Sequence, residues 1–347
     1  MSNSNKSEKV NIPPVGLLNL SRENKNQKNK NLDEISNLYN ICYINSSIQC
    51  LFHLDEFIYN ILNSSGGNLC KATVDLVNNM RFHDKKKNLS ASEIKAVMGE
   101  IDEKYKENKQ EDADEFISNY INALIEETAD KSLSKIIKPY DNKDKKCFEK
   151  FYNKFYKNKG SSYVLDLFYG ILRTQNFCES CNLVYLIKFN AFNILELPIY
   201  NLVKKNKKKV LDMKSILNNY TSKYKISNTC EICKNQLYTE TKIYTLPQCP
   251  IIYFGRKINN YFINNDINIS ETFDFNDFMS YKETDDSNNN NIYKIKGIID
   301  YTSFGKLGHY SATCLCNNKW YNFDDIYVEE DEKPFLYKKP IILFYGK

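Results

Sequence analysis

The stretch Asn37-Leu38-Tyr39-Asn40-Ile41-Cys42-Tyr43-Ile44-Asn45-Ser46-Ser47-Ile48-Gln49-Cys50-Leu51 decides how the rest of the chain is interpreted. Its first cysteine, Cys42, stands where a polar, turn-prone segment passes into an apolar run with helical spacing. A cysteine at a helix N-terminus lies in the positive end of the helix dipole, which favours the nucleophilic thiolate. A lone cysteine before a helix is more often a small core residue, so catalysis requires a base elsewhere. The apolar side chains predict one helix of roughly five turns, and they are Ile44, Ile48, Leu51, Leu54, Ile58 and Ile61.

Composition indicates a soluble globular protein of one large domain or two. The 347 residues are 42% hydrophobic and 26% charged, with a formal net charge of +5. That charge is too small and too dispersed to predict nucleic-acid binding. The lysine run at 204–209 is expected to be a solvated loop, with phosphate contact as the alternative. No apolar run approaches the roughly 20 residues that span a bilayer, so no membrane segment is expected.

The N-terminus and the cysteines indicate where the protein works. Residues 1–6 are polar and lack the apolar core of a signal peptide. Eleven cysteines without such a signal favour a reducing compartment, in which thiols serve metals or catalysis rather than disulfides. We therefore expect a cytoplasmic or nuclear protein.

Periodicity predicts helices first and strands afterwards. Helices are expected at 91–105, where Ser90 and Glu93 have the spacing of a capping box, and at 112–127, whose first turn is acidic. Residues 139–162 show little period and are expected to be irregular. Short strand-like runs follow at 183–189, 194–199, 242–246, 251–254, 293–299, 310–316 and 341–345, and 285–291 is a low-complexity loop. This order is typical of an α+β fold rather than of alternating βαβ units.

Two C-x-x-C pairs predict a structural metal site. Cys178 and Cys181 form one pair, and Cys230 and Cys233 form the other. Each pair can direct two thiolates at one tetrahedral Zn²⁺, and four thiolates would leave no open position for catalysis. Residues 182–229 separate the pairs by more than a zinc ribbon usually allows, so they must form an excursion. A redox role is the alternative, but it expects one C-x-x-C beside a βαβ unit.

The base must come from three histidines. His53 lies too far along the predicted cysteine helix to reach Cys42, and His83 sits in a polar stretch. His309 follows a glycine turn at the start of a strand, and a second strand ends in Asp324 and Asp325. A hairpin joining these strands would place a carboxylate beside the imidazole, where it could hold the ring and stabilise imidazolium. A satisfied core histidine is the default interpretation of His309 taken alone.

Four blocks together resemble the catalytic domain of ubiquitin-specific proteases, which are cysteine deubiquitinases. They are the Cys42 stretch, Gln110-Glu111-Asp112-Ala113-Asp114-Glu115-Phe116, the histidine block from Gly308 to Asp325, and the paired cysteines. Weaker similarities occur in the same order at 168–170, 195–199, 246–250 and 342–345. The resemblance covers nearly the whole chain from about residue 16.

The resemblance implies a role for each matching residue. Cys42 matches the nucleophile, His309 the general base, Asp324 the third triad member, Asp325 an adjacent acid and Asn37 the oxyanion-hole side chain. Asp112 and Glu115, on one helix face, match acidic contacts to the Arg-containing ubiquitin tail, and Gly308 and Tyr310 are further expected substrate contacts. An Asn amide N–H can stabilise the oxygen that becomes negative when a thiolate attacks a carbonyl.

The same resemblance implies a papain-like fingers–palm–thumb fold with zinc-binding fingers. Residues 1–15 would be a flexible tail and 16–347 a single catalytic domain. Within it, the thumb would cover about 32–160, the fingers about 170–245, and the palm about 161–200 and 240–347. The implied partners are ubiquitin and its conjugates, bound by a monomer with a structural Zn²⁺.

Departures from the family pattern fall next to the nucleophile. The family usually has Gly-Asn-Thr-Cys, whereas this chain has Tyr39-Asn40-Ile41-Cys42. Tyr39 cannot adopt positive φ as cheaply as glycine, which could alter the loop that places Asn37. Gly16-Leu17-Leu18-Asn19-Leu20 also resembles the family's lead-in, so 21–36 reads as an insertion and Asn19 rivals Asn37 as oxyanion donor.

Three functions follow from these patterns. The first is a thiol isopeptidase that cleaves after the C-terminal glycine of ubiquitin or of a related modifier. The second is a ubiquitin-binding module that has lost turnover through the Tyr39 and Ile41 changes. The third is a zinc-ribbon nucleic-acid binder, supported only by the basic run at 204–209.

Overall fold

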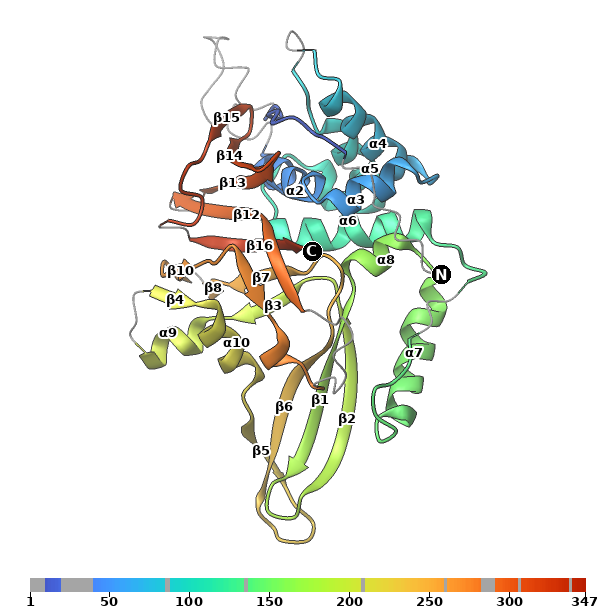
Figure 1. Cartoon of the computed structure of the whole chain (residues 1–347), viewed down its shortest axis with the longest axis vertical. Coiled ribbons are helices and arrows are strands. Elements are labelled where there is room, and N and C mark those ends of the chain that lie inside the picture. The colour runs from blue at the N-terminus through green and yellow to red at the C-terminus, as the bar shows by residue number, and fades with distance from the viewer. Residues whose placement is uncertain are drawn as a thin grey trace. The chain divides into compact units, whose positions relative to one another are not determined.

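The computed structural model describes residues 10–19, 40–84, 88–133, 137–206, 210–258, 261–281, 291–304, 307–336 and 339–347 (Figure 1). The chain divides into two compact units. Unit 1 consists of the chain up to Thr128 together with Ile295–Gly346, and unit 2 consists of Ala129–Lys294 with Lys347. No helix among the described residues is long and apolar enough to cross a membrane.

The N-terminal part of unit 1 is helical, as predicted. The predicted helix at 112–127 is confirmed, because α6 spans Ala113–Thr128 and buries the apolar face that its period indicates. The helices of unit 1 are α2 (Cys42–Phe52), α3 (Asp55–Leu62), α4 (Asn68–Arg81), α5 (Ser92–Ile101), the 3-10 helix η2 (Glu103–Lys106) and α6.

The prediction of a five-turn cysteine helix was wrong. The structure breaks it into α2 and α3 at Leu54, which has the extended angles φ −92° and ψ 106°. Asp55 and Glu56 then occupy the first turn of α3, where acidic side chains stabilise a new helix N-terminus. The apolar period continues across the break because Leu54, Ile58 and Ile61 are all buried.

The predicted helix at 91–105 was partly wrong. It ends at Ile101, whose side chain is exposed, and is followed by η2. The predicted capping box does not form. Ala91 is the N-cap, and the hydroxyl of Ser90 accepts the N–H of Ser92 instead.

Helix α2 lies in the core of unit 1, and all its residues are buried. It contacts α6 on one side, where the ring of Tyr43 packs edge-on against Phe116 at 5.6 Å between centroids. It also contacts strand β13, where Cys50 Sγ lies 3.7 Å from Cys314 Sγ. The nucleophile candidate is therefore carried on a helix that the core holds rigidly.

The sheet of unit 1 carries the histidine block. Its strands lie in the order β15-β14-β13-β12-β16, and β13 and β14 form the antiparallel hairpin that the sequence predicted. The order also explains why His309 can meet Asp324, because each residue lies near the same end of that hairpin. The strands are β12 (Ile292–Phe304), β13 (Leu307–Cys316), β14 (Lys319–Asp324), β15 (Tyr327–Glu330) and β16 (Pro340–Gly346).

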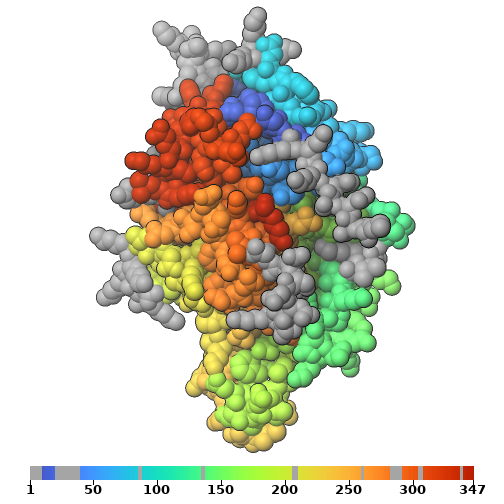
Figure 2. All heavy atoms as spheres, viewed as in Figure 1, coloured from blue at the N-terminus to red at the C-terminus, as the bar shows by residue number. Residues whose placement is uncertain are grey.

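A long antiparallel sheet dominates unit 2. Its strands lie in the order β2-β1-β6-β5, and they end in a slender projection, coloured green and yellow in Figure 2. Leu183, Val184 and Leu186 of β2 are exposed there. The sheet is formed by β1 (Gly170–Cys178), β2 (Leu183–Phe192), β5 (Tyr224–Thr229) and β6 (Gln236–Thr245).

Shorter elements complete unit 2. Strand β3 pairs in parallel with β7, and β4 pairs in parallel with β10. Lys204 lies in helix α9, so the prediction of a loop from residue 204 was wrong, whereas 207–209 and the predicted loop at 285–290 lie outside the described residues. These elements are α7 (Lys145–Lys159), α8 (Tyr163–Phe168), β3 (Leu195–Pro198), α9 (Tyr200–Asn206), β4 (Val210–Asp212), α10 (Met213–Thr221), β7 (Ile251–Gly255), β8 (Lys257–Ile258), β9 (Tyr261–Phe262), β10 (Asp266–Asn268), β11 (Thr272–Asp274) and η3 (Asn276–Phe278).

The prediction that 139–162 is irregular was wrong, because residues 145–159 form α7. Its aromatic residues recur at helical spacing and pack on β2 and β6. Phe148 contacts Phe189 edge-on at 5.2 Å and Tyr244 at 5.5 Å between centroids. Lysines and asparagines between the rings lower the mean hydropathy, which hides the period of the aromatic face.

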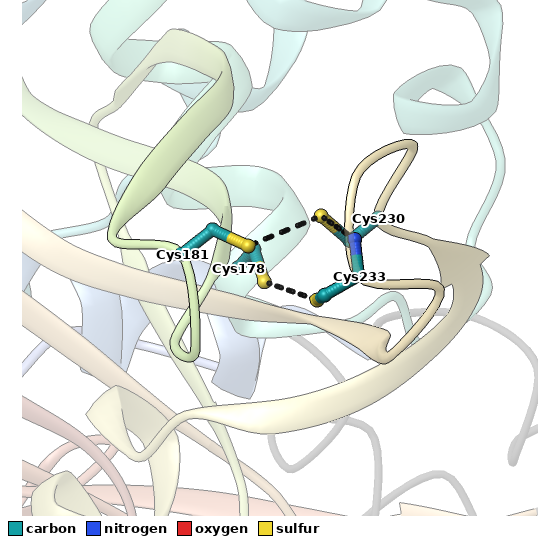
Figure 3. Close-up of side chains that lie close together, drawn as sticks. All are labelled: Cys178, Cys181, Cys230 and Cys233. Atoms are coloured by element: carbon teal, nitrogen blue, oxygen red, sulfur yellow. Dashed lines mark hydrogen bonds between the residues drawn. The ribbon is translucent and has the colours of Figure 1, made fainter.

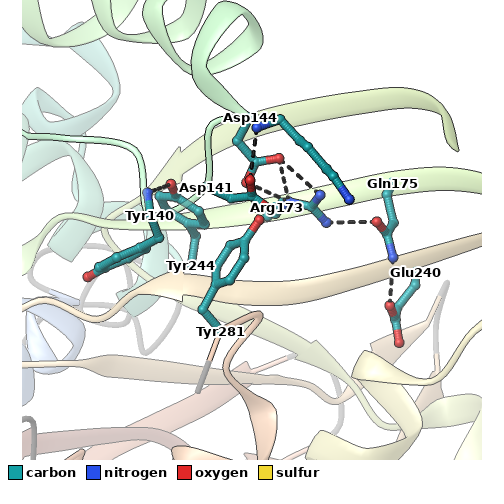
Figure 4. A network of polar contacts seen from close by, with 9 residues as sticks. Tyr140, Asp141, Asp144, Arg173, Gln175, Glu240, Tyr244 and Tyr281 are labelled. Atoms are coloured by element: carbon teal, nitrogen blue, oxygen red, sulfur yellow. Dashed lines mark hydrogen bonds and ion pairs between the residues drawn. The ribbon is translucent and has the colours of Figure 1, made fainter. Parts of the chain in front are cut away.

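A buried ion pair fixes the start of α7 to the base of β1 (Figure 4). Asp144, which precedes α7 and is fully buried, accepts bonds from Arg173 Nε at 3.0 Å and from its Nη2 at 3.0 Å. Tyr281 also donates its hydroxyl to Asp144, and Arg173 donates to Gln175 at 2.8 Å. Because every charge in the network is paired, loss of one partner would leave a buried charge and cost about 3–5 kcal/mol.

Candidate functional site

The nucleophile candidate lies at the first residue of α2. Cys42 is buried, with 3% of its surface exposed, and Ile41 before it is the N-cap. Neither acidic side chains in the first turn nor a side-chain cap compete for the helix N-terminus. The first N–H groups of a helix have no partner within it, so this helix end presents the positive end of the dipole to the Cys42 side chain.

The candidate base contacts both the nucleophile and an acid. His309 Nε2 lies 2.5 Å from Asp324 Oδ1, with the ring a quarter exposed. A hydrogen bond with Cys42 raises the pKa of His309 to about 9, against the opposing effect of burial, and the charge of Cys42, a hydrogen bond with Asp324 and the charge of Asp325 add to the rise. The imidazole is therefore protonated near neutral pH, as a thiolate–imidazolium pair requires.

The second acid is built into the scaffold. Asp325 is 4% exposed and has a left-handed backbone, with φ at 56°. Its carboxylate accepts the side-chain amides of Asn19 at 3.0 Å and Asn45 at 2.9 Å, and its carbonyl accepts the N–H of Leu17. Side-chain oxygens of both acids lie within 4.8 Å of a ring nitrogen of His309. Asp324 thus bonds to the imidazole ring, whereas Asp325 bonds to Asn19, Asn45 and the backbone of Leu17.

The structure describes only one of the two candidate oxyanion donors. Asn37 lies outside the described residues, as does Tyr39. Asn19 is buried, and its amide is bound to Asp325 beside the His309 and Asp324 pair. Asn45 was not among the predicted site residues, although its position one helical turn after Cys42 is a signal that could have found it.

Sequence reasoning also missed Gln110, the first residue of the acidic block. Its amide nitrogen Nε2 lies 3.4 Å from Cys42 Sγ and 2.7 Å from the carbonyl oxygen of Gly308, to which it donates. Its Oε1 accepts the N–H of Gly308 at 3.2 Å. Gln110 therefore connects the nucleophile with the residue next to His309.

The residues expected to contact the substrate lie near the site, and they already form contacts with other residues of the chain. Tyr310 donates its hydroxyl to Asp112 Oδ1 at 3.2 Å, and burial and the nearby Asp112 charge raise the pKa of Tyr310 well above its usual range. Glu115, about half exposed, pairs with Lys104 at 2.5 Å. Gly308 has no room for a side chain, since a Cβ there would lie 1.9 Å from the hydroxyl of Tyr301.

The four predicted metal ligands meet in unit 2 (Figure 3). Cys178 Sγ lies 3.5 Å from Cys233 Sγ, Cys181 Sγ lies 3.8 Å from Cys230 Sγ, and all four sulfurs are within 4.8 Å of one another. Thiolates 2.3 Å from a tetrahedral zinc would be about 3.8 Å apart, so the cluster fits one ion. Hydrogen bonds from the hydroxyl of Tyr185, 3.0 Å from Cys230 Sγ, and from the backbone N–H groups of Cys233 and Ile232 together lower the pKa of the Cys230 thiol to about 6.

Comparisons with known proteins identify the family that the chain resembles. Residues 33–345 match the family model described as ubiquitin carboxyl-terminal hydrolase. The chain is 23% identical to ubiquitin carboxyl-terminal hydrolase 4 of Vanderwaltozyma polyspora, covering 94% of this chain and 42% of that protein. It is 24% identical to ubiquitin carboxyl-terminal hydrolase Usp2 of Drosophila melanogaster, covering 93% of this chain and 36% of that protein. The chain thus spans about two fifths of the length of these relatives.

A solved structure shows the fold. The SAGA Ubp8/Sgf11/Sus1/Sgf73 DUB module bound to ubiquitin aldehyde has a chain that matches with a TM-score of 0.70 at 18% identity. The match covers 98% of this chain and 70% of that one. The predicted α+β class and papain-like protease fold are therefore confirmed.

Proposed function

The chain belongs to the ubiquitin carboxyl-terminal hydrolase family, and from that premise we propose that it is a cysteine deubiquitinase. It would cleave the peptide or isopeptide bond after the C-terminal glycine of ubiquitin. The observation that carries the proposal is the contact of His309 with both Cys42 and Asp324 within unit 1. A nucleophile, a base and an orienting acid are the groups that acyl transfer by a thiol requires.

The proposed reaction uses these groups in two stages. The Cys42 thiolate attacks the glycine carbonyl carbon, and the imidazolium of His309 gives its proton to the departing lysine amine. The carbon–nitrogen bond breaks and a thioester to Cys42 remains. His309 then takes a proton from water as the water oxygen attacks the thioester carbon. The carbon–sulfur bond breaks, the thiolate re-forms beside the imidazolium, and the released glycine carboxylic acid loses its proton to solvent. Asp324 holds the ring in the orientation that both transfers need.

Developing charge on the substrate oxygen needs donors beside the sulfur. The backbone N–H of Cys42 at the start of α2 is one. The role of Asn37 as the side-chain donor stays a proposal that rests on the family resemblance. Asp112, Glu115, Gly308 and Tyr310 are proposed to contact the ubiquitin tail.

The cysteine cluster would hold a structural Zn²⁺. Cys178, Cys181, Cys230 and Cys233 supply four sulfur donors, which is a complete tetrahedral set for zinc. Such an ion stabilises the local fold, and it offers no open position for a substrate. The proposed reaction therefore uses only the residues around Cys42.

Further proposals concern the organisation of the chain. We propose that 16–347 form one catalytic domain, preceded by a tail, with thumb, fingers and palm in the ranges given above, acting as a monomer in the cytoplasm or nucleus. The resemblance to ubiquitin-specific proteases motivates them. Light scattering after size-exclusion chromatography tests the oligomeric state, and a stable dimer would contradict it. Cell fractionation tests the location, and recovery in a secreted fraction would contradict it.

A ubiquitin probe with a C-terminal electrophile tests the activity. Wild-type protein should form a covalent adduct and hydrolyse ubiquitin–rhodamine, and Cys42→Ala should do neither. Cys147→Ala, which removes a partly exposed thiol on α7, is the matched control and should behave as wild type. An adduct that survives Cys42→Ala would overturn the proposal. Binding of ubiquitin–rhodamine without hydrolysis would show instead a binding module of the same fold.

A further inference from the structure

Gln110 lies between the nucleophile and the strand that carries His309. It belongs to the segment just before α6, and the helix starts with the bond from the N–H of Phe116 to the carbonyl of Asp112. Its side-chain amide forms two bonds with one backbone residue, because it donates to the carbonyl of Gly308 at 2.7 Å and accepts its N–H at 3.2 Å. This reciprocal pair resembles a single rung of a β-ladder.

The same pair fixes the orientation of the amide. A flipped amide would place its oxygen against the Gly308 carbonyl and its NH₂ against the Gly308 N–H, which loses both bonds. The amide nitrogen must therefore lie on the side of the carbonyl, and that side also faces Cys42 Sγ at 3.4 Å. One N–H serves Gly308, and the second is left for the sulfur.

The sulfur then has two donors around it. One is the protonated imidazole of His309, and the other is the side-chain amide of Gln110. Hydrogen bonds to a charged acceptor are roughly twice as strong as neutral ones, so this surrounding favours the thiolate over the thiol. We propose that Gln110 is a catalytic residue of this site, which hydrogen-bonds the Cys42 thiolate with one amide N–H while its other bonds hold Gly308 and the adjacent His309 in place.

The catalytic role of Gln110 rests on the proposed function. Its effect on the Cys42 thiolate can be measured without ubiquitin. Ionisable groups lie on several elements around the site. They are Tyr43 on α2, Glu111 and Asp112 before α6, His309 on β13, and Asp324 and Asp325 at the end of β14. Substitution of Gln110 leaves all of these groups in the chain.

The test is the pH profile of Cys42 alkylation by iodoacetamide, followed by peptide mass spectrometry. Gln110→Met removes the N–H donors without adding charge, and Gln110→Glu removes them and adds a negative charge. The pH of half-maximal rate should rise by about 0.5–1 unit in Gln110→Met and by about 1–2 units in Gln110→Glu. Asn122→Asp on α6 adds the same charge as Gln110→Glu without a contact to Cys42 in the described structure, and should leave the midpoint unchanged.

Turnover gives a second measurement. With ubiquitin–rhodamine, kcat should fall at least tenfold in both Gln110 variants, with a smaller change in KM. Wild-type alkylation midpoints in both variants would overturn the proposal, and so would failure of both variants to fold by circular dichroism. If wild type hydrolyses no ubiquitin substrate but the alkylation midpoints shift as stated, the role of Gln110 stands and the proposed function fails.

Discussion

The side-chain amide of Asn19 donates to Oδ2 of Asp325 at 3.0 Å, across a sequence separation of 306 residues. The other carboxylate oxygen accepts the amide of Asn45 from α2 at 2.9 Å. Asp325 therefore ties the segment before residue 20 and the nucleophile helix to the end of the His309 hairpin. Its neighbour Asp324 contacts the imidazole of His309 instead. The two adjacent acids therefore have different partners: Asp325 bonds to the scaffold, and Asp324 bonds to the candidate base.

The first prediction separates these two acids. Asp325→Asn keeps the left-handed backbone but turns one buried acceptor into a donor facing another amide, which should lower the free energy of unfolding by about 1–3 kcal/mol. Asp324→Asn, at a side chain 40% exposed, should lower it by less than about 1 kcal/mol but reduce kcat roughly 10²–10⁴-fold. Urea unfolding and ubiquitin–rhodamine hydrolysis measure both. Equal stability losses would contradict the division of roles.

The raised pKa of His309 predicts how stability depends on pH. Because the folded state holds the proton more tightly, this contribution is complete below pH 6.5 and is lost as pH rises through about 9. Over that window the wild-type free energy of unfolding should fall by up to about 3 kcal/mol. Cys42→Ser removes the largest cause of the shift, so its stability should fall much less. Parallel pH curves for the two proteins would exclude this explanation.

The third prediction is that removal of the metal destabilises the protein through unit 2, which carries the cysteine cluster. Purified protein should contain one zinc per chain, held by the two cysteine pairs. Chelation, or Cys178→Ser, should lower the unfolding temperature by roughly 10 °C or more, because binding free energy of a structural zinc is folding free energy. Cys147→Ser is the control and should keep the metal. A protein free of metal whose stability is indifferent to chelators would refute the assignment.

Some of these features could be predicted because the information is local. The period of α6 lies within its own residues, and the spacing of the paired cysteines predicts the cluster that their four sulfurs form. The end of α2 could not be predicted, since the apolar period runs on through Leu54 into α3. Asn19 and Asn45 lie 306 and 280 residues before their partner Asp325. The contact of Gln110 with Cys42 depends on the folded position of β13. Only the tertiary structure brings such groups together.

The fourth prediction concerns the close approach at Gly308. An added Cβ would lie 1.9 Å from the hydroxyl of Tyr301, whose ring packs on Tyr310 at 4.8 Å between centroids and so cannot move freely. Gly308→Ala should cost about 1–3 kcal/mol and displace the Gln110 bonds, which lowers kcat. In a Tyr301→Ala background the same change should cost little, and thermal unfolding of the four proteins measures this coupling. Additive costs would show that Tyr301 is not the obstacle.

The pairing of Lys104 with Glu115 leads to the last prediction. Although partial burial opposes its charge, the hydrogen bond to Glu115 raises the pKa of Lys104, so the pair stays ionised. If Glu115 contacts a basic tail, Lys104 competes with that tail for the same carboxylate. Lys104→Met should then lower KM for ubiquitin–rhodamine about 2–5-fold with little change in kcat, because a half-exposed ion pair contributes only about 0.2–1 kcal/mol.

A neighbouring lysine supplies the control for this experiment. Lys106 pairs with Glu103 at 3.7 Å, so Lys106→Met removes the same charge without releasing Glu115. Its KM should stay within about twofold of wild type, and the difference between the two variants should shrink at high salt, where exposed charges are screened. Glu115→Gln combined with Lys104→Met should abolish the gain. If both lysine variants change KM equally, net charge and not competition for Glu115 governs binding of the tail.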